Sequence, residues 1–184
     1  MSTVMDTALV LARLNNFEGR IPYMYRCTGG EVTVGIGHAI PTADDAVKLS
    51  WMLGSRPATP DEVRADYARI AATPKGQVAS AYAPLTTCRM PNGAIDTLVA
   101  GDIAIFTGKL AARLPNWNRY PECVQAALFD MGFNLGVDGL LKFHKMLAAC
   151  DAADWKTTAA ECHREGIGDD RNNQTAALIL QALK

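Results

Sequence analysis

Three reactive side chains lie close together in the first part of the chain: Glu18, Cys27 and Thr33. Eight residues separate the first from the second, and five separate the second from the third. A carboxyl group can donate a proton to a leaving atom, while a thiol and a hydroxyl can activate or hold a water molecule. If the fold gathers these side chains on one wall of a cleft, their chemistry is acid-assisted bond cleavage.

The first element that must position them is a helix ending beside Glu18. Apolar side chains recur at helical intervals over residues 4–17, and Gly19 and Pro22 end this pattern. The negative end of the helix dipole and partial burial beside Phe17 both disfavour a charged carboxylate. We therefore expect a raised pKa for Glu18, as a general acid requires, with a solvated helix-end glutamate as the alternative.

A β-hairpin is predicted to carry the other two residues. Two adjacent glycines in Thr28-Gly29-Gly30-Glu31 are typical of a tight turn between strands. In the following run EVTVGIG, a period of two places the valines and the isoleucine in the core and Thr33 on the other face. Gly35 and Gly37 are expected to leave that face bare, which suits a groove for a bulky ligand.

The rest of the chain is predicted to be mostly helical. Thr59 followed by Pro60 is typical of a capped helix start. The apolar residues of 121–136 surround most of their helix, which places it at the centre of the core. Residues 73–91 are expected to form a loop. The sequence thus predicts one α+β, mostly α domain (1–184) with helices at 42–54, 59–72, 93–113, 121–136, 140–150, 154–166 and 170–183.

The composition is that of an ordinary globular chain. Its 184 residues carry a formal net charge of −1, which does not suit a nucleic-acid partner. Apolar runs fall short of the roughly 18 residues that a membrane span needs. The first residues also lack the basic and apolar regions of a signal peptide. We therefore expect a monomer without a membrane span, made in the cytoplasm without a signal peptide.

Cysteine and histidine spacing gives no sign of a metal centre. No CxxC pair is present, and the histidines are scattered without ligand spacing. We expect neither a metal nor another cofactor, and free thiols, with one disulfide left open. The residues concerned are Cys27, Cys88, Cys123, Cys150 and Cys162, and His38, His144 and His163.

The spacing of Glu, eight residues, Cys, five residues and Thr, followed by VGIGH, resembles the active-site run of phage-type lysozymes, glycoside hydrolase family 24, where the middle position is Asp or Cys. VQAALFDMGFNLG is similar to the central helix of that family, LLKFHKMLAACDAADWKTTAAEC to the next two helices, and GIGDDRNNQTAALI to its closing element. The resemblance covers residues 4–40 and about 92–183. It implies a two-lobed lysozyme-like fold with a hairpin lobe, a helical lobe (92–184) and an insertion at 51–91.

The resemblance implies a muramidase that hydrolyses the β-1,4 bond between N-acetylmuramic acid and N-acetylglucosamine in peptidoglycan. Glu18 would protonate the leaving oxygen, and Cys27 and Thr33 would assist a water that attacks from the opposite face, with inversion. An ordinary thiol with a pKa near 8.5 is mostly neutral at pH 7. The role of Cys27 as base, nucleophile or neutral partner of the water therefore stays open.

Three further residues are candidates for substrate binding on the same resemblance. Arg171 would pair with Glu18, although a helix-cap ion pair is the alternative. Asn134 would contact a sugar N-acetyl group, or act as a plain helix-end amide. His38 would brace the hairpin, or serve as a structural histidine bonded to a carboxylate or backbone group.

The resemblance also implies the biological setting. Peptidoglycan glycan strands would be the substrate, in the periplasm or in the wall of a target bacterium. The enzyme would act as a phage endolysin or as an antibacterial effector of a type VI secretion system, the latter with an immunity protein that plugs the cleft. Two other functions stay open: a non-catalytic peptidoglycan-binding module on the same fold, and a lytic transglycosylase.

Overall fold

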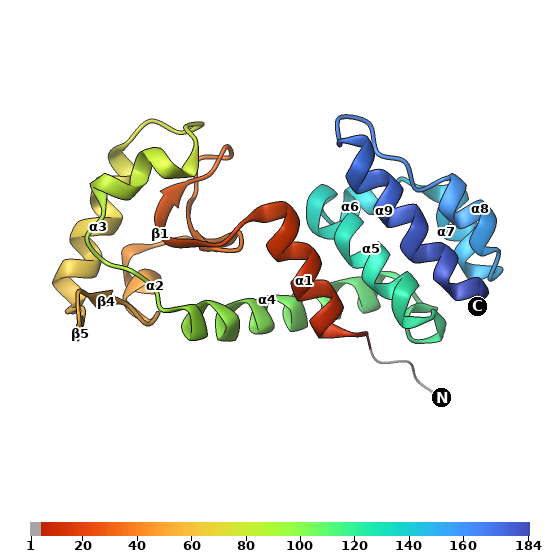
Figure 1. Cartoon of the computed structure of the whole chain (residues 1–184), viewed down its shortest axis with the longest axis horizontal. Helices are drawn as coiled ribbons and strands as arrows, with labels where there is room; N and C mark the ends of the chain where they lie inside the picture. Colours follow the sequence, from red (N-terminus) through yellow and green to blue (C-terminus); the bar gives the residue numbers. More distant parts are fainter. Residues whose placement is uncertain (1–4) are drawn as a thin grey trace. The chain divides into compact units, whose positions relative to one another are not determined.

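A computed structural model describes residues 5–184, with only the backbone at Glu18. The fold is α+β and about 60% helical, with a small antiparallel sheet of three strands and another of two (Figure 1). The chain divides into two compact units. One comprises Glu18–Asp102, and the other comprises the segment up to Phe17 together with Ile103–Lys184.

Two helices belong to both units. The first, α1 (Thr7–Glu18), ends where the chain passes into the Glu18–Asp102 unit. The second, α4 (Asn92–Arg113), begins in that unit and continues into the other. Each observed end of these helices lies within one residue of the predicted end, with one exception. The start of α1 was predicted at residue 4, which lies outside the described part of the chain.

The three-stranded sheet contains the predicted hairpin. It has the order β1 (Ile21–Arg26), β2 (Val32–Gly35) and β3 (His38–Ile40), and each neighbouring pair is antiparallel. The turn between β1 and β2 has Gly30 at φ +99°, a backbone conformation that residues with a side chain rarely adopt. The predicted tight turn at the two glycines is therefore confirmed.

The predicted bare strand face is wrong. The run EVTVGIG is not one strand, because the chain turns after Gly35 and returns as β3. A side chain at Gly35 would meet Cγ2 of Ile95 at 3.3 Å, so α4 covers this face. Thr33 is itself only 3% exposed, as buried as the valines on either side of it. Sequence alternation identified one buried face of β2, but contacts with distant residues bury the other.

The predicted helix at 42–54 is shorter than expected. It spans α2 (Ala43–Val47), and Nε1 of Trp51 donates to the carbonyl of Ala46 at 2.8 Å as the chain folds back. A two-stranded sheet of β4 (Met52–Leu53) and β5 (Arg56–Pro57) follows. Local apolar pattern predicted a helix here, whereas long-range pairing of Met52 with Arg89 holds the segment extended.

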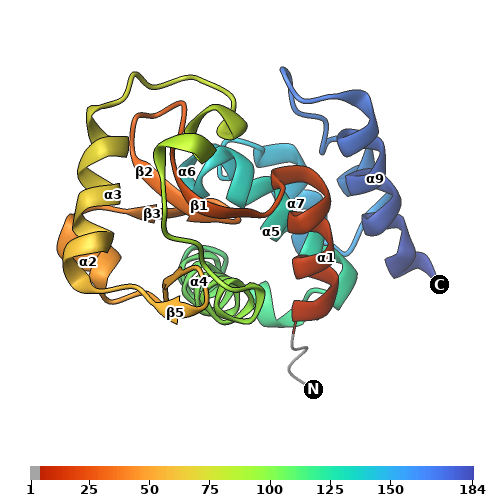
Figure 2. The ribbon, with the colours of Figure 1, turned by 60° about the vertical axis from the view of Figure 1, so that its left-hand side comes forward.

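The next helix, α3 (Pro60–Ala72), has the predicted start. Thr59 and Glu62 form a reciprocal capping box at its first turn. The segment that follows was predicted as a loop and contains the short 3-10 helix η1 (Ala79–Leu85). Figure 2 shows α3 beside the three-stranded sheet and α2, and contacts within the unit agree.

The other unit is built around α5 (Glu122–Leu135). Nine consecutive residues from Val124 to Gly132 are buried, which confirms that this helix lies in the core. Phe106, Phe129 and Phe133 form a cluster beside it, with ring centroids 5.2 to 5.9 Å apart. Figure 1 shows α5 next to the last long helix, α9 (Asp169–Leu180), and the two are in contact.

Short helices complete this unit. The helix predicted at 140–150 begins later, as α7 (His144–Asp151), and a separate short helix, α6 (Val137–Leu140), precedes it. Asp154 caps α8 (Trp155–Ala160) as predicted, but this helix ends before residue 166, because Arg164 is buried and its N–H donates to Asn172 at 3.1 Å. Two 3-10 turns, η2 (Trp117–Arg119) and η3 (Gln181–Leu183), lie before α5 and after α9. Within residues 5–184 no helix is both long and apolar enough to cross a membrane.

Asp66 of α3 holds the segment after η1 through hydrogen bonds, and a substitution at Asp66 tests their contribution to stability. Its buried carboxylate accepts from the N–H groups of Thr87 and Cys88 at 2.8 and 2.7 Å and pairs with Arg69. We expect Asp66→Ala to lower the free energy of unfolding by about 3 kcal/mol, because buried N–H donors lose their acceptor. Urea denaturation followed by circular dichroism measures this.

The matched control is Asp61→Ala on the same helix. The Asp61 side chain is 98% exposed, so its loss is expected to cost less than about 1 kcal/mol. Equal shifts of the urea midpoint for the two variants would contradict the assigned role of Asp66.

Candidate functional site

The helix that precedes the predicted hairpin ends at Glu18, as expected. Gly19 then adopts φ +73°, and β1 begins at Ile21. Nη1 of Arg20 donates to the carbonyl of Asn92 at 3.2 Å, and its Nη2 pairs with Asp96, so this junction is tied to the first turn of α4. The side chain of Glu18 lies outside the described part of the chain, and its predicted environment stays a prediction.

Cys27 and Thr33 are brought together by the hairpin. Thr33 pairs with Tyr25 in the register of β1 and β2, which places it across from the strand that leads to Cys27. The N–H of Cys27 donates to the carbonyl of Glu31 at 3.0 Å, and the N–H of Gly30 donates back to the carbonyl of Cys27 at 2.9 Å. The Thr33 hydroxyl donates to the same Glu31 carbonyl at 3.1 Å, so Cys27 and Thr33 share one acceptor and two of the three predicted residues are neighbours.

The turn stabilises a negative charge on the Cys27 sulfur. Burial raises the pKa of the Cys27 thiol, but bonds from the backbone N–H of Glu31, the Thr33 hydroxyl and the N–H groups of Gly30 and Gly29 lower it by more. The net pKa therefore lies below its ordinary value, and the expectation of an ordinary thiol is corrected. Successive N–H groups of a turn form such an anion-binding concavity, which residue types alone did not reveal.

Arg26 fixes the hairpin to the helix behind it. Its Nε donates to the carbonyl of Gly30 at 2.8 Å, and its Nη1 donates to the carbonyl of Thr73 at the end of α3 at 2.7 Å. The turn that carries the donor groups around Cys27 is thus tied to the end of α3 by two hydrogen bonds. Preorganised donors of this kind stabilise charge without reorganisation.

His38 is a structural partner of α4. Its Nδ1 lies 2.9 Å from Oδ2 and 3.0 Å from Oδ1 of Asp102. This agrees with the alternative of a histidine bonded to a carboxylate, and it joins β3 to α4 within one unit. A contact of His38 with substrate stays a prediction.

Arg171 and Asn134 lie in the other unit. Nη2 of Arg171 forms an ion pair with Oδ1 of Asp130 at 2.9 Å, a partner that was not predicted. The predicted pairing of Arg171 with Glu18 stays a prediction, because the Glu18 side chain lies outside the described part of the chain. Oδ1 of Asn134 is buried and has no hydrogen-bond donor in the described part of the protein. An N-acetyl contact at that oxygen would therefore require the amide to turn.

Asp130 is the residue that sequence reasoning missed. It lies in the middle of the apolar helix α5 and is surrounded by Arg13, Arg164 and Arg171. A signal was present, because an ionisable residue on a fully buried helix requires charged or hydrogen-bonding partners. The identity of those partners depends on the tertiary fold.

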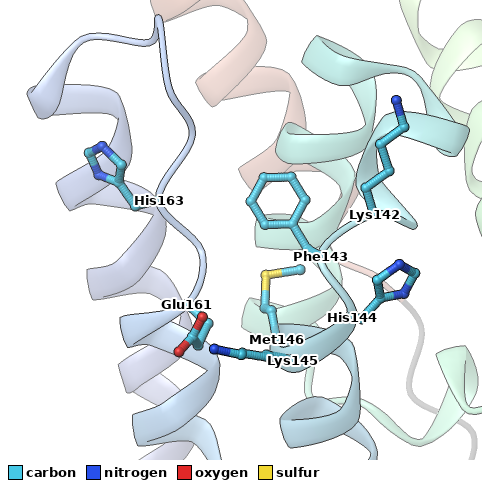
Figure 3. A pocket seen from close by; sticks show the side chains of 7 residues that line it. All are labelled: Lys142, Phe143, His144, Lys145, Met146, Glu161 and His163. Atoms are coloured by element: carbon cyan, nitrogen blue, oxygen red, sulfur yellow. The ribbon is translucent and has the colours of Figure 1, made fainter.

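A cavity of about 490 Å³ lies beside α7, and none of the site residues predicted from the sequence lines it. Figure 3 shows Phe143 and Met146 between α7 and the segment 161–163, with Lys145 directed toward Glu161. His144 and His163 also line this cavity. The hairpin has the better case for catalysis, because its polar groups converge on one sulfur. Among the side chains that the structure describes, no cluster of His, Cys, Asp or Glu is suited to hold a metal.

The lowered pKa of Cys27 predicts selective alkylation. Burial raises the pKa of Cys88 and of Cys150 to about 11. At pH 8 the thiolate fraction of Cys27 should exceed theirs by about 100-fold or more. Limited iodoacetamide treatment followed by peptide mass spectrometry is expected to label Cys27 first, with a half-maximal rate at a lower pH than for a cysteine in an unstructured peptide.

Thr33→Val supplies the control for this reading. Loss of the hydroxyl removes one donor to the sulfur, so the pH of half-maximal alkylation should rise while the hairpin fold is kept. Labelling that is slower at Cys27 than at Cys88, or an unchanged pH profile in Thr33→Val, would refute the thiolate assignment.

Comparisons with known proteins leave the family open. No protein-family model matches the chain, and no curated protein matches it. The functional assignment therefore depends on the residues and on their geometry.

Proposed function

We propose that this protein is a peptidoglycan hydrolase with a lysozyme-like fold that cleaves the β-1,4 bond between N-acetylmuramic acid and N-acetylglucosamine. The observation that supports it most is the Cys27 sulfur, which lies at a turn whose N–H groups, together with the Thr33 hydroxyl, lower the pKa of its thiol. A residue whose pKa is shifted by specific hydrogen bonds is a candidate for catalysis. The α+β architecture, with a small sheet in one unit and a buried helix in the other, agrees with the proposed fold.

In the proposed mechanism two groups act on opposite faces of the sugar. Glu18 gives its proton to the glycosidic oxygen as the bond to the anomeric carbon breaks. The Cys27 thiolate takes a proton from a water, whose oxygen forms the new bond to that carbon. Thr33 orients the thiolate and shares the water. The product inverts at the anomeric carbon, because water enters opposite the leaving group.

The lowered pKa of the Cys27 thiol favours some of the roles that the sequence left open for this residue. A neutral partner of the water needs no stabilised thiolate, whereas a base does, and so does a nucleophile. The proposed role is therefore a base, with attack by sulfur on the sugar as the alternative that product stereochemistry separates.

Glu18→Gln tests the enzymatic assignment. Loss of the general acid should reduce clearing of purified peptidoglycan by at least about 100-fold. Asp61→Asn, which changes an exposed carboxylate elsewhere in the same unit, is the control and should clear like wild type. Equal clearing by Glu18→Gln would end the proposal. Mass spectrometry of the products should show reducing ends, since 1,6-anhydro ends would identify a transglycosylase.

Substitutions at Cys27 test the base. Cys27→Ala should lower turnover at least about tenfold, or roughly 1.4 kcal/mol of barrier. Cys27→Asp should keep activity and extend it to lower pH, because a carboxylate stays ionised down to about pH 4 while a thiolate does not. The measurement is the pH dependence of turnover, and wild-type rates in Cys27→Ala would remove the sulfur from the mechanism.

A further inference from the structure

The buried carboxylate of Asp130 draws three arginine side chains together. Its side chain is 3% exposed, and Oδ1 lies 2.9 Å from Nη2 of Arg171. Oδ2 lies 3.2 Å from Nη1 of Arg164 and 3.4 Å from Nη2 of Arg13. These arginines come from α9, from the segment before α9, and from α1. One residue of the central helix thus binds three separate segments of its unit.

The charge on Asp130 is what keeps this cluster together. Burial raises the pKa of Asp130, but the Arg171 hydrogen bond and the charges of Arg171, Arg13 and Arg164 lower it by more. The carboxylate is therefore ionised in neutral solution. Loss of its charge would leave three guanidinium groups close together in a poorly solvated interior, where like charges repel strongly.

Two of the arginines also hold Phe17. The guanidinium carbon of Arg171 lies 4.7 Å from the centroid of the Phe17 ring, and that of Arg13 lies 5.4 Å from it. Both distances are typical of cation–π contacts. Phe17 is the last residue before Glu18 in α1. The Asp130 cluster therefore fixes the final turn of the helix at the residue that precedes the proposed acid.

We propose that Asp130 and Phe17 are positioning residues: acting through Arg13 and Arg171, they set the place of the backbone that carries Glu18. This inference rests on the proposed function. A displacement of about 1 Å at a reacting group can cost about 100-fold in rate, so the clamp acts on turnover. The clamp does not contribute to substrate affinity, so its loss should leave KM unchanged.

The test compares a pair of substitutions at Phe17. Phe17→Leu keeps an apolar side chain but removes the aromatic ring that the two guanidinium groups contact. It should lower kcat about tenfold and leave KM within about twofold of wild type. Phe17→Tyr keeps the ring faces and should restore most of the rate. Both are assayed on soluble glycan fragments, with rates expressed per folded molecule from circular dichroism at a temperature well below unfolding.

Asp130→Asn should reproduce the loss of kcat while it also lowers stability. Asp138→Asn is its matched control, because it removes an exposed ion pair with Arg113 in the same unit and should change neither kcat nor KM. Should Asp130→Asn fail to fold, the Phe17 pair decides the question.

The inference is overturned if Phe17→Leu has the wild-type kcat per folded molecule, or if Phe17→Tyr loses as much rate as Phe17→Leu. A failure of the proposed function gives a different result, in which Glu18→Gln matches wild type. An active wild type, an inactive Glu18→Gln and an unaffected Phe17→Leu would together keep the enzyme and reject the clamp.

Discussion

A buried negative charge needs compensation, and this requirement organises the larger unit. Asp130 sits on a helix whose other central residues are buried and mostly apolar, so its carboxylate must find partners inside the protein. It finds them on α1, on α9 and on the segment before α9. Removal of such a partner costs far more than the ion pairs contribute, because uncompensated charge is left in a medium of low dielectric constant. The helices that pack around α5 are therefore fixed by charge as well as by apolar contact.

The smaller unit has the converse arrangement. It brings together hydrogen-bond donors that stabilise a negative charge on a sulfur. Backbone N–H groups of the hairpin turn point at the Cys27 sulfur, and Arg26 anchors the turn to α3. The two devices share one physical basis. In each, groups that would bind water in an unfolded chain are held by the fold in a geometry that favours an ion. The proposed chemistry uses the Cys27 thiol of the hairpin, and the proposed clamp uses the arginines around Asp130.

Local sequence patterns predicted most of the helices and the hairpin turn. They did so because helix caps, paired glycines and apolar periodicity act over a few residues. The errors fall where distant residues intervene. Ile95 covers the strand face that Gly35 was expected to leave bare, and Met52 pairs with Arg89 where a helix was predicted. Neither contact is visible to a pattern read along the chain.

The sequence by itself determined which residues carry reactive groups, and that Cys27 and Thr33 would meet across a tight turn, because hairpin register follows from a short loop. Only the tertiary structure decided how charged those groups are. The pKa of the Cys27 thiol depends on the direction of turn N–H groups, and that of Asp130 depends on arginines far away in the chain. The residue type determines the pKa of a side chain in water. Burial and the orientation of neighbouring dipoles and charges shift the pKa from that value, and these exist only in the folded protein.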